Sequence, residues 1–577
     1  MRKYLFCLFI LVLLVTPLFA SMYMFQMDHP VYDEMDALYV MEGKAAAMGI
    51  RPWSDTDVRH MLQDVKPKSS AGKALKERIE SYLEDVERKN TRFLLDLSFT
   101  PGFAFHTNPD DFDAEEDWYT NNIQDDTLAD AGIGLSYKEN IYGYMDFSIG
   151  LNYAGLEDIS DNNVTEDDIR YNEYFSTNIL GVSEGTFSAN MPYRALLVAG
   201  ADGFRVNVGR DRLSWGNGMM GNLMLGDTLP YHNFFSATFT GSEHFSYQML
   251  ISFFAHSSDY INEGTFSGSG PDIGDDVDGL RFFLGHRFEV SLFDHRLTFA
   301  INESIMYQSE SGYLNPGALN PLMFLHNLYI SENSNSLMTA EIEWSPFRRW
   351  SFYLQGAVDE FSLPGEKSPP DKGSKPNAWG VMAGVRGVFP AGENYFYSGF
   401  EFVYTSPYLY HRTGDDDEAA YDLYYVSSIR AYDDDDGMKI LTRYLSLPYG
   451  SDAIAGLFRF GYNDIDSFKV EGDVMFMAHG IVSAYSSIRE YTGSESVATT
   501  PSTENAFTDE DYDSLYNVLS DGEVEYSLIF GAGGEKQVTK WFSFDASLYF
   551  NVYWNKDNLS TCTKFDIQLA VGLKFFI

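Results

Sequence analysis

The chain has 577 residues, of which 84 are acidic and 40 basic, giving a net charge of −44, and aromatic residues make up 16 % of it. Acidic disordered chains are poor in aromatic residues, so this composition excludes simple disorder. A strongly acidic surface repels phosphate backbones, which excludes nucleic acid as a partner. The two cysteines are too few for a disulfide framework or a thiolate metal site.

The first 20 residues have the pattern of a signal peptide. Arg2 and Lys3 precede an apolar stretch, and Ala20 offers a small residue for cleavage. The stretch is shorter than the ~20 residues of a spanning helix, so a signal anchor is the weaker alternative. Beyond it the sequence has no apolar run long enough for a spanning helix. An exported chain of this kind is either soluble or a β-barrel.

Residues 21–90 are expected to form a helical region. Ser54 and Asp57 make a capping box, and Pro67 ends the helix that this box begins. Apolar residues recur at three- and four-residue spacing on either side of that helix. These residues are Val31, Met35, Leu38 and Met41 before it, and Leu75, Ile79, Leu83 and Val86 after it. The region is nearly neutral, and we expect a small amphipathic bundle that packs on something larger.

From residue 91 onward the apolar period changes to two, which is typical of β-strands. The clearest runs are 93–105, 141–153, 280–292 and 542–554, and the last run alternates from Phe565 to Ile577. Such runs match tilted membrane-crossing strands of ~9–11 residues, whereas strands of soluble sandwiches average ~5–6 residues. Many begin or end in aromatic residues, as interfacial girdles do. We therefore predict that residues 91–577 form an all-β transmembrane barrel of about 18 antiparallel strands.

Much of the negative charge is clustered in acidic segments between the predicted strands. These segments are 110–117, 272–278, 415–418, 433–436 and 509–513. A solvated surface of extracellular loops is the expected explanation. The alternative is bridging of Ca²⁺ or Mg²⁺ at the cell surface, since carboxylate oxygens suit both ions. No segment has EF-hand spacing, so we assign no metal ligand and expect no cofactor.

Two short motifs resemble enzyme signatures but lack the required context. Gly181–Gly185 matches G-x-S-x-G around Ser183, yet no helical period follows it. Gly216–Gly221 matches G-x-G-x-x-G without a βαβ unit around it. We therefore expect no catalytic residue and no enzymatic activity. A surface hydrolase, the rival interpretation, rests on Ser183 alone.

Residues 209–218, which read GRDRLSWGNG, and 222–227, which read NLMLGD, resemble the most recognisable segment of the Wzi-type capsule-assembly outer-membrane proteins. Further segments agree in order and content. They are 29–32, 51–54, 79–84, 286–288, 315–316, 320–322, 335–337 and 356–360. The likeness covers most of residues 28–361, and the ordered set is more specific than any single motif.

The resemblance implies a barrel of about 18 strands whose periplasmic end is closed by an N-terminal helical bundle. It also implies a lectin-like protein that holds capsular or related exopolysaccharide on the outer membrane, with no catalytic residue to carry over. The expected partners are polysaccharide, outer-membrane lipid and lipopolysaccharide, and the barrel-assembly machinery during insertion. The rival from the transport class is a porin that passes small solutes or cations.

The segment 209–233 is the best candidate for contact with a glycan, because its glycines interrupt strand pairing and its side chains suit a sugar. The candidate ligands are Arg210, Arg212, Trp215, Asn217, Asn222, His232 and Asn233, with Asn320, His326 and Asn327 as weaker candidates. The alternative is that these residues pack the plug against the barrel wall.

Overall fold

The structure, a computed structural model, describes residues 22–63, 65–89, 93–109, 111–112, 128–137, 140–151, 177–180, 187–190, 194–242, 244–254, 280–309, 320, 324–325, 334–360, 377–412, 423–434, 437–482, 484, 487–488, 498–499, 524–560 and 562–576. The predicted signal peptide lies outside these residues. None of the described helices is both long and apolar enough to cross a membrane.

The described α-helices are α2 (Val31–Glu42), α3 (Asp55–Gln63) and α4 (Ser70–Lys89). Helix α2 ends at Gly43, whose φ of 84° is the left-handed conformation that favours glycine. The predicted capping box at the start of α3 forms, because Asp57 N–H donates to Ser54 Oγ over 3.1 Å and Ser54 N–H donates to Asp57 Oδ2 over 2.8 Å. The helical period of the sequence therefore predicted all three helices.

The strands of the first half are β1 (Ile50–Arg51), β2 (Leu94–Phe99), β3 (Gly102–His106), β4 (Ala129–Tyr137), β5 (Ile141–Leu151), β6 (Thr177–Leu180), β7 (Phe187–Asn190), β8 (Ala195–Ala201), β9 (Phe204–Asp211), β10 (Ser214–Trp215), β11 (His232–Phe239), β12 (Phe245–Phe254), β13 (Arg281–Leu292) and β14 (Leu297–Gln308). Those of the second half are β15 (Ser334–Trp344), β16 (Trp350–Glu360), β17 (Ala378–Ala391), β18 (Asn394–Thr405), β19 (Val426–Asp434), β20 (Gly437–Tyr444), β21 (Ala453–Asp464), β22 (Phe468–His479), β23 (Ser487–Ile488), β24 (Ala498–Thr499), β25 (Glu525–Thr539), β26 (Phe542–Trp554) and β27 (Thr563–Phe576). A 3₁₀ turn, η4 (Lys556–Asn558), precedes β27.

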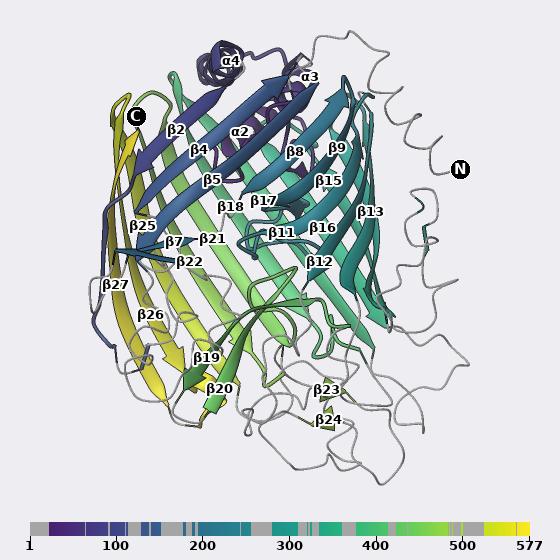
Figure 1. Cartoon of the computed structure of the whole chain (residues 1–577), viewed down its shortest axis with the longest axis vertical. Helices are drawn as coiled ribbons and strands as arrows, with labels where there is room; N and C mark the ends of the chain where they lie inside the picture. The colour runs from purple at the N-terminus through teal and green to yellow at the C-terminus, as the bar shows by residue number, and fades with distance from the viewer. Residues whose placement is uncertain are drawn as a thin grey trace.

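The long strands form one closed antiparallel barrel of 18 strands (Figure 1). Strands β2 and β3 act as one barrel strand interrupted at Pro101, and β7 and β8 lie in succession along β5. The C-terminal strand β27 pairs with β26 on one side and with β2 and β3 on the other, which closes the barrel. Strand β26 has the bounds that its apolar period predicted.

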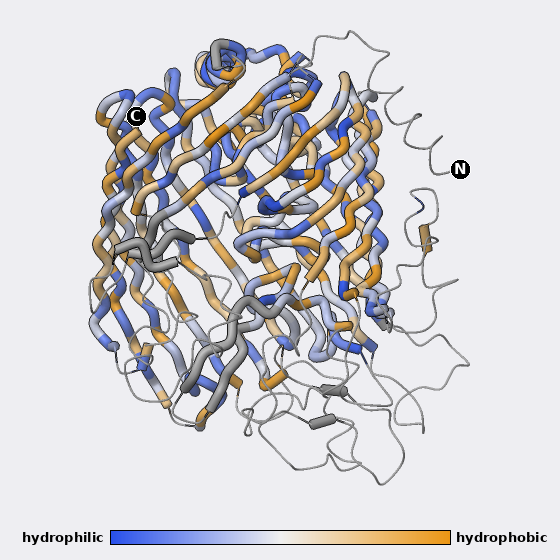
Figure 2. Tube along the Cα trace, in the orientation of Figure 1, coloured by the Kyte–Doolittle hydropathy of each residue, from blue (hydrophilic) through white to orange (hydrophobic). Residues whose placement is uncertain are grey.

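Side chains alternate between an apolar outer face and a polar inner face. On β26 the outward Phe544, Leu548 and Phe550 are exposed, whereas the inward Ser543 and Asn551 are buried. Figure 2 shows the same alternation of apolar and polar residues along many strands. An apolar outer face on a closed barrel is the arrangement that a lipid bilayer requires. The described strands therefore form a membrane-spanning wall.

The two ends of the barrel differ in the length of their connections. Short turns such as 202–203, 240–244 and 293–296 join strands at one end, and long connections such as 255–280 and 406–452 join them at the other. Membrane barrels place short turns in the periplasm and longer loops outside. We therefore name these the periplasmic and extracellular ends. The helices lie at the periplasmic end (Figure 1).

Residues 22–89, here named the plug region, pack on the barrel interior and its periplasmic turns. Asp57 Oδ2 accepts a hydrogen bond from Arg205 Nη1 of β9 over 2.5 Å, and both side chains are buried. Lys44 Nζ lies 2.8 Å from Asp294 Oδ1 in a periplasmic turn. The apolar faces of the helices share one buried cluster with Val388 and Tyr395, on β17 and β18. The bundle is thus attached by both packing and ion pairs.

Candidate functional site

The connection between β9 and β11, residues 212–231, turns inward from the barrel wall. Its strand β10 pairs with β1 of the plug region, so that Ile50 lies opposite Trp215. The Gly216 N–H also donates to Gly49 O over 2.9 Å. Gly216 has a φ of +111°, which permits this tight approach. We name residues 212–231 the first inward segment.

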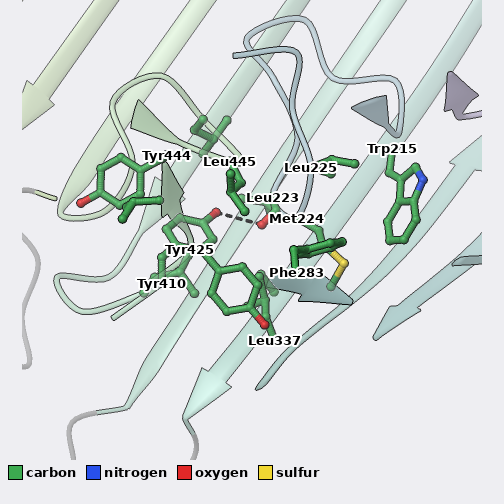
Figure 3. Packing of buried hydrophobic residues seen from close by; sticks show 14 of the residues in the cluster. Trp215, Leu223, Met224, Leu225, Phe283, Leu337, Tyr410, Tyr425, Tyr444 and Leu445 are labelled. Carbon is green, nitrogen blue, oxygen red and sulfur yellow. Dashed lines mark hydrogen bonds between the residues drawn. The ribbon is translucent and has the colours of Figure 1, made fainter. Parts of the chain in front are cut away.

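Trp215 is fully buried at the base of the first inward segment. Its Nε1–H donates to Gln248 Oε1 over 2.6 Å, and its ring meets Phe283 edge-to-face with centroids 6.0 Å apart. Both partners belong to the barrel wall. Trp215 therefore fixes the segment to the wall and is not accessible to a sugar ring (Figure 3).

The two asparagines of the segment also bond within the protein. Asn222 Oδ1 accepts from Gly218 N–H and Gln355 Nε2, while its Nδ2 donates to Ser214 Oγ. Asn217 Nδ2 donates to Ala47 O and to a Glu343 carboxylate oxygen. These amides hold the segment between the plug region and β15–β16, as the packing alternative predicted.

His232 and its neighbours lie where the segment rejoins the wall. His232 is buried, with Nδ1 3.1 Å from Ser252 Oγ. Arg210 and Asn233 lie on the outer side of the wall, because Asn233 shares the outward register of exposed Phe235. Arg210 Nε–H donates to Asn233 Oδ1 over 2.8 Å, and its guanidinium stacks on Tyr231 at 3.9 Å. Strand alternation therefore turns Arg210 and Asn233 outward, away from the lumen that the first inward segment enters, and their contact with a glycan stays a prediction.

Arg212 and Asp227 form the most accessible charged pair of the first inward segment. Arg212 Nη2 lies 2.5 Å from Asp227 Oδ2, and Arg212 Nε–H donates to Asp227 Oδ1 over 2.8 Å. The relative solvent exposure of the side chain is 42 % for Arg212 and 30 % for Asp227. Among the predicted glycan ligands, Arg212 thus combines an accessible charge with a fixed position.

Phe324 and Asn320 belong to the connection between β14 and β15, of which the structure describes few residues. The Phe324 ring meets Phe288 with centroids 5.5 Å apart, and Phe288 alternates with the inward-facing Arg287. Phe324 therefore lies on the outer face. Asn320, four residues earlier, is exposed. Its role as a weaker candidate for glycan contact stays a prediction, and His326 and Asn327 lie outside the described residues.

A second long connection, between β18 and β21, also folds into the barrel. Its residues 406–412, 423–427 and 442–452 meet the first inward segment in one buried cluster that includes Tyr410, Tyr425 and Leu445 (Figure 3). Tyr410 Oη donates to Leu223 O over 2.9 Å, and the Gly226 N–H donates to Leu445 O over 2.7 Å. We name these residues the second inward segment. The two segments form a compact body inside the wall, reaching from the plug region toward the extracellular end.

Little in the sequence predicted that this second inward segment folds into the barrel. Tyr408, Tyr410, Tyr424 and Tyr425 stand close to a strand end, where interfacial aromatic residues are common. The high density of tyrosines in a long polar connection was the one signal in the sequence that could have indicated a buried segment. The structure buries all four side chains, so they pack the interior and do not belong to a girdle.

Most of the acidic segments and the G-x-S-x-G motif around Ser183 lie outside the described residues. Within the described ranges no three metal-binding side chains come together. The G-x-G-x-x-G motif, Gly216–Gly221, falls in the first inward segment, where no helix follows it. Its glycines serve close packing, since a Cβ on Gly218 would lie 1.9 Å from Gly221 O.

No protein-family model and no curated protein sequence matches the chain. Among solved structures, the fold is similar to Wzi of Escherichia coli, described as a carbohydrate-binding outer-membrane β-barrel involved in group 1 capsule assembly. The match covers 96 % of this chain and 99 % of Wzi, with 12 % identity and a TM-score of 0.56. The fold is that of Wzi. The resemblance inferred from the sequence is thus confirmed for the fold.

Other outer-membrane proteins match less well. The protein opdK from Pseudomonas aeruginosa is 10 % identical, with 84 % of this chain and 98 % of that chain covered and a TM-score of 0.39. OccAB1 from Acinetobacter baumannii is also 10 % identical, with 85 % and 97 % covered and a TM-score of 0.39.

Proposed function

We propose that the protein is exported by its signal peptide to the bacterial outer membrane, where it binds capsular or related exopolysaccharide at the cell surface. The observation that carries this proposal is the packed body inside the barrel. An open diffusion pore has no need for two long connections that bury aromatic residues against each other. A rigid body of this kind suits a binding protein, because a preorganised surface loses little entropy on binding.

The first inward segment links the helices to this body. Ile50 pairs with Trp215, and Leu223 in the same segment accepts the hydrogen bond from Tyr410. Arg212 and Asp227 remain partly exposed beside this linkage. We assign them to contact with sugar hydroxyls and assign Trp215, Asn217 and Asn222 to positioning, because their polar groups are used within the protein.

The net charge constrains the polysaccharide. A chain with a net charge of −44 repels an acidic polymer at long range. The proposed ligand is therefore a neutral glycan, or an acidic one held through Ca²⁺ or Mg²⁺ bridged by the acidic loops. The remaining partners are lipid and lipopolysaccharide around the apolar wall and the assembly machinery during insertion.

Direct binding tests this proposal. The host's purified surface polysaccharide is titrated against the purified protein, with and without a chelator of divalent cations. Saturable binding supports the anchor function, and loss of binding in chelator identifies the bridged mode. Failure of the intact protein to bind the polysaccharide under either condition contradicts the proposal.

A cation channel is the second candidate function, favoured by one observation. The inward positions of β2, β4 and β26 carry the half-exposed carboxylates Asp96, Asp130 and Asp545. An acidic lumen would favour cations over anions. Planar-bilayer recordings of the intact chain, and of a chain without residues 21–90, separate the two functions. Large, stable, cation-selective currents from the intact chain would favour the channel.

We also propose that the protein has no enzymatic activity. Support comes from the motif around Ser183, which lacks the helical period that a nucleophile elbow requires. The test compares esterase and lipase activity of the purified protein with that of Ser183→Ala. An activity that this substitution abolishes would overturn the proposal.

A further inference from the structure

A cavity of about 300 Å³ lies between the plug region and the periplasmic rim of the barrel. Helix α3 forms one wall, the turn between β11 and β12 forms another, and β13 lies behind them. Gln63, Ser242 and His244 are exposed at its mouth. The volume is at the lower end of the ~300–1,000 Å³ of ligand pockets, so it suits a small ligand. The extracellular function proposed above makes no use of it.

The carboxylates of the cavity already have cationic or polar partners. Asp57 accepts from Arg205 over 2.5 Å and from Thr240 Oγ1 over 2.8 Å. Asp202 Oδ1 lies 2.8 Å from His60 Nε2. An anionic ligand would meet these acids, and a cationic ligand would have to compete with their present partners. The charge distribution therefore favours a neutral ligand.

Glu289, at the back of the cavity, is held in the same way. Its Oε2 accepts from Arg287 Nη2 over 2.8 Å and from Gly49 N–H over 3.2 Å. Arg287 also bonds Glu341, over 2.6 Å. A bound ligand could therefore use Glu289 only as an additional acceptor, which a neutral hydroxyl group can supply without displacing Arg287.

The other lining groups are hydroxyls, imidazoles and rings. Ser242 and Ser246 supply hydroxyls, and His244 supplies an imidazole that can donate or accept. Tyr39 of α2 supplies an aromatic ring, whereas the ring of Phe245 packs on Phe239 at the outer face of the wall. Sugars present hydroxyls around the edge of a ring and C–H groups on its face, so hydroxyl, imidazole and aromatic groups together complement them. We propose that this cavity binds one neutral saccharide unit from the periplasmic side.

This periplasmic saccharide site does not depend on the surface function proposed above. A saccharide in the periplasm can come from the cell-wall glycan or from a polysaccharide on its way out. Both present the same chemistry to the cavity. The probes that separate them are N-acetylglucosamine for the cell wall, and glucose and galactose for neutral hexose polymers.

The test uses the full-length protein in a detergent without a sugar headgroup, with binding followed by saturation-transfer NMR. Ser242→Trp fills the mouth of the cavity from an exposed turn. Ser70→Trp is the matched control, because Ser70 is exposed at the start of α4 and does not line the cavity. We expect wild type and Ser70→Trp to bind at least one probe, and Ser242→Trp to bind it at least tenfold more weakly.

His244→Ala provides a second variant that removes a polar group without adding bulk, and we expect it to weaken binding severalfold. Equal binding by wild type and Ser242→Trp would overturn the proposal, as would the absence of saturable binding of all three sugars to wild type. A failure here leaves polysaccharide attachment at the cell surface intact, so it is distinguishable from a failure of the surface function.

Discussion

Ile50 in the plug region lies opposite Trp215 in the first inward segment, because their strands β1 and β10 pair inside the barrel. Trp215 in turn bonds Gln248 of the wall. The helices, the first inward segment and the barrel are therefore joined through one buried residue. A displacement of Ile50 at the periplasmic end would therefore be transmitted through Trp215 to the two inward segments, which extend toward the extracellular end.

Trp215→Ala should loosen this connection. Loss of a fully buried tryptophan from a protein core costs about 3–5 kcal/mol, and Gln248 would lose its donor. We expect a lower melting temperature in detergent and faster protease cleavage of residues 212–231. Trp541→Ala is the control, because Trp541 is 58 % exposed in a periplasmic turn. Equal stability of the two variants would contradict the assigned role of Trp215.

Removing the charge of Asp57 should weaken attachment of the plug region. Asp57→Asn leaves the buried guanidinium of Arg205 without its anion, which costs about 3–5 kcal/mol for a buried pair. Lys44→Met, the comparison, breaks a pair whose acid, Asp294, is 79 % exposed and should cost below about 1 kcal/mol. Hydrogen exchange of α3 measures both effects. Equal exchange in the two variants would exclude Asp57–Arg205 as the main ionic attachment.

Packing of the plug region should weaken as pH rises. Burial raises the pKa of Glu34 to about 8 from an ordinary 4.5, and Tyr82 Oη donates to its Oε1 over 3.1 Å. Because the folded pKa is the higher one, the stability that the protonated carboxyl contributes is complete below about pH 4.5 and is lost as pH rises toward 8.

Hydrogen exchange of α2 between pH 6 and 9, corrected for the intrinsic rate, measures this effect. Glu34→Gln should remove the dependence on pH, since it keeps the shape of the side chain without an ionisable group. Glu80→Gln on α4 is the matched control at an exposed position. A dependence that persists in Glu34→Gln would assign the effect to another group.

Gly226→Ala should separate the two inward segments. A Cβ at this position would lie 1.8 Å from the backbone oxygen of Ser446, which cannot move like a flexible side chain. Gly356→Ala is the control, because no atom lies within 4 Å of a Cβ there. We expect lower thermal stability and weaker polysaccharide binding for Gly226→Ala alone. Normal polysaccharide binding by Gly226→Ala would show that the packed body does not support the ligand.

The sequence predicted elements whose pattern is local. The alternation along 542–554 matches β26, and the capping box of Ser54 and Asp57 forms as expected. The bond between Asp57 and Arg205 could not be foreseen, because nothing in a single sequence pairs residues on separate elements. The capping box still placed Asp57 at the start of a helix.

The candidate site was harder to predict than the fold. Trp215 and Asn222 are residue types that bind sugars, but they are also types that pack and bond inside proteins, and their burial decides between the two roles. Arg210 lies one residue before the end of β9, where alternation turns it outward. A shift of one residue in the strand boundary reverses such an assignment.

The most direct test of the central claim is deletion of the gene in its host, followed by measurement of cell-attached and shed polysaccharide. The proposed function predicts that shed polysaccharide rises and attached polysaccharide falls, with synthesis unchanged. Re-expression of the intact chain should restore attachment. Unchanged attachment in the deletion strain would contradict the proposal that this barrel holds polysaccharide at the cell surface.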